Sequence, residues 1–219
     1  MANQGMVSIS AGSLDDLTAS IAPGVVRSAA ISALERTKTS ARAEAGRLIT
    51  SVWNISRGNL ERTASGRDRI TVSGRVSDDL TAEIQFWAGG ISLFYFGAKE
   101  YQLTAAQTKQ TAKRLGKAYK AGNKQRVGIK VQLLRGGKVA MLRQFFARVR
   151  YGKGDGVHVG VFRRVPGRYK TGSAKMIESM SVGIATMVNQ PKVLQPLTVF
   201  IQDTFAKRMQ HELQRRGYA

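Results

Sequence analysis

The sequence contains no cysteine and only two histidines among its 219 residues. The absence of cysteine excludes disulfide bonds and thiolate metal sites. No apolar run approaches the roughly 20 residues that a membrane helix needs, and residues 1–7 lack the charged and apolar regions of a signal peptide. We therefore expect no membrane partner.

Groups that support catalysis or metal binding are also scarce. His158 lies within a predicted strand, where a structural role is more common than a catalytic one. His211 begins the sequence His-Glu-Leu-Gln-Arg, which lacks the second histidine of a His-Glu-x-x-His zinc helix. Residues 152–156 and 167–173 are rich in glycine, but neither ends in the Gly-Lys-Ser/Thr of a P-loop. The sequence thus predicts no catalytic residue, no metal ligand and no cofactor, and we expect a protein that is not an enzyme.

Acidic residues are almost missing from one third of the chain. Residues 101–177 contain 19 lysines and arginines against one acidic residue, Asp155, so +18 of the protein's net charge of +21 lies there. A compact fold of such a segment costs self-repulsion unless a polyanion or an acidic partner lies close by. A solvated face is the ordinary explanation of a basic run, but an excess of this size favours binding to phosphate or to acidic proteins.

The cations expected to contact DNA or an acidic partner lie in residues 98–125 and around the strands that follow. They are Lys109, Lys113, Arg114, Lys117, Lys120, Lys124, Arg126, Arg163, Arg164, Arg168 and Lys170. Residues 98–125 contain too few apolar side chains to become ordered alone. This segment is therefore predicted to be a basic insertion or arm, helical or extended, that orders against a partner.

Two long helices are predicted, one towards each end of the chain. From Pro23 to Val52, apolar residues recur every three to four positions, which indicates a helix of about 25 to 30 residues. Leu197 to Leu213 carries an apolar residue at every fourth position, which predicts an amphipathic helix of about 18 residues starting at Pro196 and ending at Gly217. Glu212 falls away from that apolar stripe. Residues 1–22 are predicted to be an arm with a short helix from Leu14 to about Ala22.

Between these helices the apolar periodicity is two, typical of strands. A short helix is expected near Asn59, followed by alternating strands over residues 70–86. Gly89-Gly90 is a predicted hairpin turn, and residues 91–96 are the predicted returning strand.

A second meander is expected from Val127 to Val165. Its Gly-Gly turn is Arg135–Lys138, its second strand carries Phe145 and Phe146, and its third strand is Val157–Val165. A basic loop, residues 166–173, and a helical segment, residues 176–187, come next. The sequence therefore predicts a single α+β domain over residues 23–219. Its mostly antiparallel sheet consists of two hairpin meanders, and the two long helices pack against it.

The order of several short motifs resembles the phage minor tail protein Z family of tail-completion proteins. These motifs are Ile91-Ser-Leu-Phe-Tyr-Phe-Gly-Ala98, the Phe-Phe-Ala at 145–147 after a basic glycine-rich turn, Gly160-Val-Phe-Arg-Arg164, and Met176-Ile-Glu-Ser-Met-Ser-Val182. The resemblance covers most of the chain after about residue 25. The segment 98–125 is longer than is usual in the family.

The resemblance implies a structural subunit of the phage neck that completes the head-proximal end of the tail and helps to join tail to head. The expected partners are further copies in a ring, favoured as a hexamer, the tail terminator, the head-to-tail connector and double-stranded DNA in the lumen. The expected location is the virion, and the host cytoplasm during assembly. Candidate subunit contacts are Phe145, Phe146, Met176, Ile177 and Met180.

Two other functions compete with this one. The basic segment would equally suit a free nucleic-acid-binding protein without sequence preference, although no RNP aromatic motif, zinc finger or heptad repeat is present. An enzyme is disfavoured by the scarcity of candidate groups. The sequence alone leaves open whether the cations face DNA or acidic neighbouring proteins.

Overall fold

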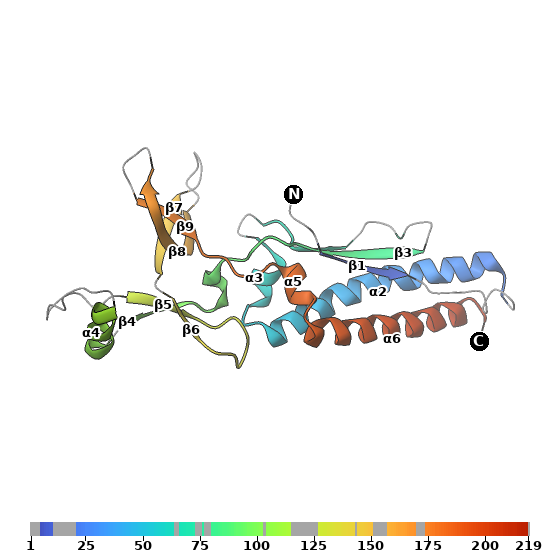
Figure 1. The fold of residues 1–219 in the computed structure, drawn as a ribbon. Coiled ribbons are helices and arrows are strands. Elements are labelled where there is room, and N and C mark those ends of the chain that lie inside the picture. Colours follow the sequence, from blue (N-terminus) through green and yellow to red (C-terminus); the bar gives the residue numbers. More distant parts are fainter. Residues whose placement is uncertain are drawn as a thin grey trace. The chain divides into compact units, whose positions relative to one another are not determined.

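The computed structural model of the chain describes residues 5–10, 21–63, 66–72, 76, 80–102, 104–114, 127–142, 144–150, 157–169 and 174–218 (Figure 1). Its internal contacts divide the chain into two compact units. Unit 1 comprises residues 1–90 and 182–219, and unit 2 comprises residues 91–181. The predicted α+β class, with antiparallel sheets and a long helix towards each end of the chain, is confirmed.

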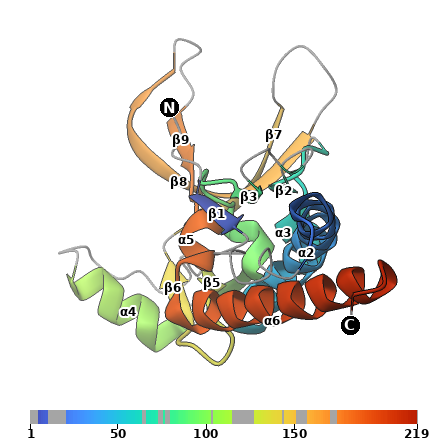
Figure 2. The same cartoon turned by 90° about the vertical axis from the view of Figure 1, so that its right-hand side faces the viewer.

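Two long helices and a small sheet form unit 1. Helix α2 is Pro23–Val52 and helix α6 is Pro191–Arg215. The short helix α3 (Arg57–Glu61) follows α2 in the chain, and the short helix α5 (Ile184–Val188) precedes α6. Figure 2 views α2 almost along its axis, with α6 crossing it. The strands are β1 (Gly5–Ser10), β2 (Ile70–Val72) and β3 (Thr81–Phe86), in the antiparallel order β1-β3-β2.

Small side chains let the two long helices approach closely. Pro23 occupies the first turn of α2, where its missing N–H costs nothing. Ala29, Ala30 and Ala33 are fully buried on the face of α2 that meets Met209 and Leu213 of α6. Alanine has little side-chain entropy to lose and leaves room for the larger side chains of α6. The predicted long N-terminal helix and its apolar face are therefore confirmed.

Helix α6 is longer than its sequence predicts. It begins at Pro191 and continues through Pro196, which was expected to be its start. A proline in the second turn removes one hydrogen bond to the carbonyl of Lys192. Because Lys192 is exposed, water can donate a hydrogen bond to that carbonyl instead. The apolar stripe is confirmed, since Leu197, Ile201, Met209 and Leu213 are buried.

The predicted alternation of β3 is confirmed, but its predicted hairpin partner is wrong. Ala82, Ile84 and Phe86 are buried and the residues between them are half-buried. The strand pairs with β1 and β2, whereas Leu93–Phe96 forms a 3-10 helix, η1. Ser92 caps η1 by accepting a hydrogen bond from the Phe94 N–H, and Gly97 ends it with a φ of +66°. A short apolar run does not by itself separate a strand from a helical turn.

Two antiparallel sheets and one helix follow η1 in unit 2. One sheet has the order β4-β5-β6, from Lys99–Gln102, Val127–Val131 and Ala140–Leu142. The other has the order β7-β8-β9, from Phe145–Arg150, Val157–Arg168 and Ala174–Glu178. Helix α4, Ala105–Arg114, comes between β4 and β5 in the chain. Leu93, Ile129 and Val161 form a buried cluster, with Phe146 packed against it.

Parts of the second meander differ from the prediction. The Gly-Gly turn joins β5 to β6, but the strand expected to carry Phe145 and Phe146 is a separate one, β7, in the other sheet. Residues 166–168 extend β8 past an irregularity in its register rather than beginning a loop. Residues 174–178 form strand β9 instead of a helix, because Ile177 pairs with Arg163 of β8. The helix begins only at Ile184.

The two ends of unit 2 are joined by main-chain hydrogen bonds. The Ser181 N–H donates to the Ile91 carbonyl over 2.7 Å, and the Leu93 N–H donates to the Ser179 carbonyl over 3.1 Å. Unit 2 is thus an insertion in unit 1 whose entry and exit are paired.

The short helix predicted from Leu14 to Ala22 falls largely on residues 11–20, outside the described residues. No helix in the described part of the chain is long and apolar enough to cross a membrane.

Candidate functional site

Unit 2 carries many exposed lysine and arginine side chains. Every such side chain that the structure describes in this unit is exposed to solvent. They are Lys99, Lys109, Lys113, Lys130, Arg135, Lys138, Arg148, Arg163, Arg164, Arg168 and Lys175. We call these residues the basic surface.

Ion pairs with acidic residues are scarce for these cations in the part of unit 2 that the structure describes. Apart from Arg168, none of the basic-surface residues takes part in an ion pair in the described structure. The whole unit has 20 lysines and arginines against three acidic residues, Glu100, Asp155 and Glu178, a net charge of +17. A net charge of this size implies strong mutual repulsion among the cations of unit 2.

Unit 1 shows the opposite arrangement. It has 15 basic against 11 acidic residues, net +4, which with the +17 of unit 2 makes the total of +21. Eight of its cations form ion pairs, among them Lys38 with Glu35 at 2.6 Å, Arg57 with Glu61 at 2.6 Å, and Arg47 with Glu44. The surplus of positive charge is thus a property of unit 2 rather than of the whole protein.

The structure places only part of the predicted contact set. Lys109 and Lys113 are exposed on α4, and Arg163, Arg164 and Arg168 are exposed on β8. Arg114 is the last residue of α4. The remaining predicted contacts lie outside the described residues: Lys117, Lys120, Lys124, Arg126 and Lys170.

Sequence reasoning missed six described members of the basic surface, one of which is Lys175 on β9. Lys99 and Lys130 lie on neighbouring strands, Arg135 and Lys138 flank the β5–β6 turn, and Arg148 is on β7. The signal that could have found the strand residues is the alternation of β5, in which exposed Lys130 lies between buried Ile129 and Val131.

The candidate subunit contacts differ in exposure. Phe146 is half-buried, packs against the core cluster of unit 2 and meets Phe94 edge to face, with 5.9 Å between ring centroids. Phe145 lies beneath the guanidinium of Arg164, 5.6 Å from the ring centroid. Met176 is half-buried, whereas Ile177 and Met180 remain 48% and 53% exposed. Ile177 and Met180 are therefore the members of this set most accessible to another subunit.

His158 pairs with Glu178 across the β7-β8-β9 sheet. The Nε2 atom of His158 lies 2.6 Å from Oε1 of Glu178, and both side chains are largely buried. Gly160 lies on β8 next to this pair. A Cβ atom at Gly160 would collide with the Glu178 carboxylate and would lie 3.1 Å from His158 Nε2. His158 therefore ties β8 to β9, which agrees with its predicted structural role.

A Gly160→Ala substitution is expected to separate this pair and to lower the free energy of unfolding by roughly 1–3 kcal/mol, the usual cost of overpacking. Urea denaturation followed by circular dichroism measures the change. Gly58→Ala is the matched control, since a Cβ at Gly58 meets nothing within 4 Å. A Gly160→Ala protein as stable as the control would show that the pair contributes nothing.

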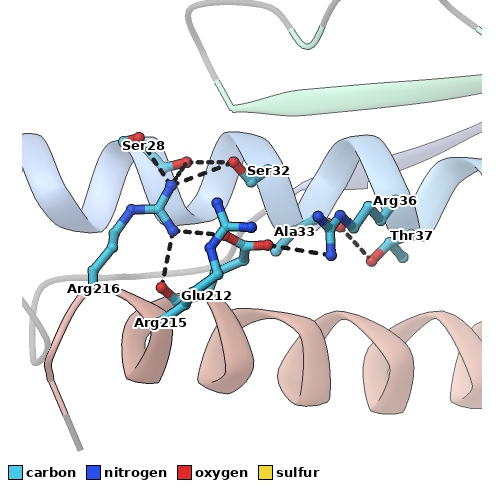
Figure 3. A network of polar contacts seen from close by, with 8 residues as sticks. All are labelled: Ser28, Ser32, Ala33, Arg36, Thr37, Glu212, Arg215 and Arg216. Carbon is cyan, nitrogen blue, oxygen red and sulfur yellow. Dashed lines mark hydrogen bonds and ion pairs between the residues drawn. The ribbon is translucent and has the colours of Figure 1, made fainter.

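A buried carboxylate connects the long helices of unit 1 (Figure 3). Glu212 of α6 is completely buried, although it falls away from the apolar stripe in the sequence. Its Oε2 atom accepts a hydrogen bond from Nη1 of Arg216 over 2.6 Å and lies 3.7 Å from Nη2 of Arg215. Its Oε1 atom lies 3.4 Å from Nη1 of Arg36 on α2. We call Glu212 with these three arginines the carboxylate clamp.

Arg216 extends the clamp to the start of α2. Its Nη2 atom donates to the carbonyl of Ser28 over 3.4 Å and to the hydroxyl of Ser28 over 3.2 Å. The hydrogen bond from Arg216 and the nearby charges of Arg215 and Arg36 lower the pKa of Glu212, and burial acts in the opposite direction. Glu212 is thus held ionised between α2 and α6.

The described residues hold no group of three or more His, Cys, Asp or Glu side chains that could bind a metal. In comparisons with known proteins, no protein-family model, no curated protein and no solved structure matched this chain.

Proposed function

We propose that the protein is a structural subunit of a phage neck, which completes the head-proximal end of the tail and helps to join it to the head. Further copies of the chain form a ring, with six as the favoured number, around the DNA channel. The terminator and the connector are its neighbours, and the virion is its final location. The protein has no catalytic role in this proposal.

The observation that carries the proposal is the segregation of charge. Eight of the 15 cations of unit 1 form ion pairs within the unit. Those of the basic surface are exposed and, apart from Arg168, form no ion pair among the described residues. A subunit that keeps +17 in one compact insertion needs an anionic neighbour to relieve the repulsion. The neck supplies such neighbours as DNA and adjoining proteins. The resemblance of several short sequence motifs to those of tail-completion proteins supports the same setting.

Imaging tests this proposal. Negative-stain electron microscopy of the purified protein and of isolated tails is expected to show a ring or a cap at one tail end. A monomer that is absent from particles would contradict it.

A free nucleic-acid-binding protein is the second candidate, and the exposed basic surface favours it as well. It predicts tight duplex DNA binding with a steep salt dependence and no association with particles. Particle association therefore separates the two functions, while DNA binding alone does not.

A further inference from the structure

The basic surface contains two chemically different groups of cations. Between residues 99 and 138 five of its six members are lysines: Lys99, Lys109, Lys113, Lys130 and Lys138, with Arg135. Between residues 144 and 175 four of its five members are arginines: Arg148, Arg163, Arg164 and Arg168, with Lys175. We call these the lysine group and the arginine group.

Two members of the lysine group face one another across strands β4 and β5. Lys99 is the register partner of Lys130, and both side chains are exposed. Directly opposed residues of antiparallel strands have Cβ atoms about 5 Å apart, so like charges there destabilise the sheet. Glu100 does not relieve them, because adjacent residues of a strand point to opposite faces. The pair therefore offers a site where one anionic group contacts two ammonium groups.

An aromatic ring lies beside this lysine pair. Tyr101 is two residues from Lys99 and so shares its face of the sheet. Its register partner is Gly128, and its ring occupies the space that a Cβ of Gly128 would need, with ring atoms 2.7 Å from that position. Two exposed lysines and a half-exposed ring on one sheet face suit a phosphate backbone with its attached sugars and bases.

The surroundings of the arginine group are more apolar. Arg164 lies over the Phe145 ring, and Arg163 is the register partner of Ile177, which is 48% exposed. Arginine, methionine and aromatic residues are enriched in protein interfaces, whereas lysine is depleted. Composition therefore distinguishes the arginine group from a surface used only for phosphate.

We infer that the lysine group is a nucleic-acid-binding surface that contacts the phosphate backbone without reading bases, and that Lys99 and Lys130 form its centre. The inference rests on the proposed function, which places the protein around the DNA channel of a phage neck. Within that neck, the inference assigns DNA to the lysine group of the basic surface. It explains why two lysines, Lys99 and Lys130, face one another although their repulsion weakens the sheet: both are needed to bind the anionic backbone.

The test measures binding of the full-length protein to a 30-base-pair duplex DNA by fluorescence anisotropy at several salt concentrations. The variant Lys99→Gln/Lys113→Gln/Lys130→Gln is expected to lose roughly 2–3 units of the slope of log K against log salt, since each phosphate contact contributes about 0.9. Its dissociation constant at 150 mM salt is expected to rise about tenfold or more. Its melting temperature is expected to stay the same or to rise, because the opposed charges are removed.

Two matched variants serve as controls. Arg148→Gln/Arg163→Gln/Arg164→Gln removes the same charge from exposed positions and is expected to change the slope by less than about 1 unit. Lys99→Arg/Lys113→Arg/Lys130→Arg keeps the charge and is expected to keep the wild-type slope. Equal losses in the lysine and arginine variants would overturn the inference, as would failure of the wild-type protein to bind the duplex.

Poly-L-glutamate provides the comparison with an acidic protein. The lysine variant is expected to lose much less affinity for poly-L-glutamate than for DNA. Equal losses for both probes would assign the lysine group to acidic proteins and overturn the inference. A neck ring that does not bind DNA would contradict this inference alone, and a DNA-binding monomer absent from particles would contradict the proposed function alone.

Discussion

Replacing Glu212 with glutamine is expected to lower the free energy of unfolding by about 3 kcal/mol, near the low end for breaking a buried ion pair. The carboxylate is completely buried and is the only acidic member of the carboxylate clamp. Glutamine keeps the shape but leaves the three arginines without a counter-charge. The cost stays near the low end because Arg36 and Arg215 are partly exposed and keep part of their hydration. Urea denaturation followed by circular dichroism gives the change.

Glu44→Gln is the control for this experiment. Glu44 of α2 also pairs with an arginine, Arg47 of the same helix, but the Arg47 side chain is 63% exposed. Exposed ion pairs contribute about 1 kcal/mol or less, so the control is expected to lose no more than that. Equal losses in the two variants would mean that the clamp does not hold α6 against α2.

Acid provides a second measurement of the same clamp. Because the folded-state pKa of Glu212 is lowered, the unfolded chain takes up its proton first as the pH falls. The stabilisation is present above the unfolded pKa of about 4.3 and is lost as the pH falls through the folded pKa. The difference in stability between the wild type and Glu212→Gln is therefore expected to shrink below about pH 4. A difference that is constant from pH 7 to pH 3 would contradict this.

Removal of the cations of the arm is expected to impair the particle rather than the fold. The variant Lys113→Gln/Arg114→Gln/Lys117→Gln/Lys120→Gln changes residues in an apolar-poor segment, so its circular dichroism spectrum is expected to match the wild type. The yield of joined heads and tails is expected to fall on the order of tenfold, because four contacts to anionic partners are lost. Plaque titre and electron microscopy of lysates measure the loss.

The control for the arm removes four cations from unit 1 instead. Arg27, Arg67, Lys192 and Lys207 are exposed there, and their replacement by glutamine is expected to leave the titre near that of the wild type. Normal plaque formation by the arm variant would show that the arm cations are not needed. Equal defects in both variants would show that total charge matters and its position does not.

Periodicity was sufficient to predict the long helices, and it failed where tertiary contacts decided the structure. The apolar faces of α2 and α6 follow from alanines and leucines at helical spacing. Residues 91–96 are apolar in almost every position, so their pattern fits a strand as well as the observed η1. Residues 174–178 form a strand because they pair with β8. This pairing depends on a distant part of the chain and cannot be predicted from the sequence of residues 174–178 alone.

The candidate sites show the same division. The excess of cations in the middle of the chain was visible in the sequence, and the exposure of the described ones agrees with it. The opposition of Lys99 to Lys130 depends on strand register, which no local pattern fixes. The burial of Glu212 could not be predicted either, because Arg36, 176 positions earlier in the chain, meets it only after α2 and α6 have packed together.

Comparison of tails from a wild-type phage with tails from a mutant that lacks this protein tests the neck assignment most directly. Electron microscopy is expected to show a ring or cap at the head-proximal end of wild-type tails, and neither that density nor joined heads in the mutant. Identical tails in the two preparations, together with a purified monomer that binds duplex DNA with a steep salt dependence, would contradict the assignment and favour a free nucleic-acid-binding protein.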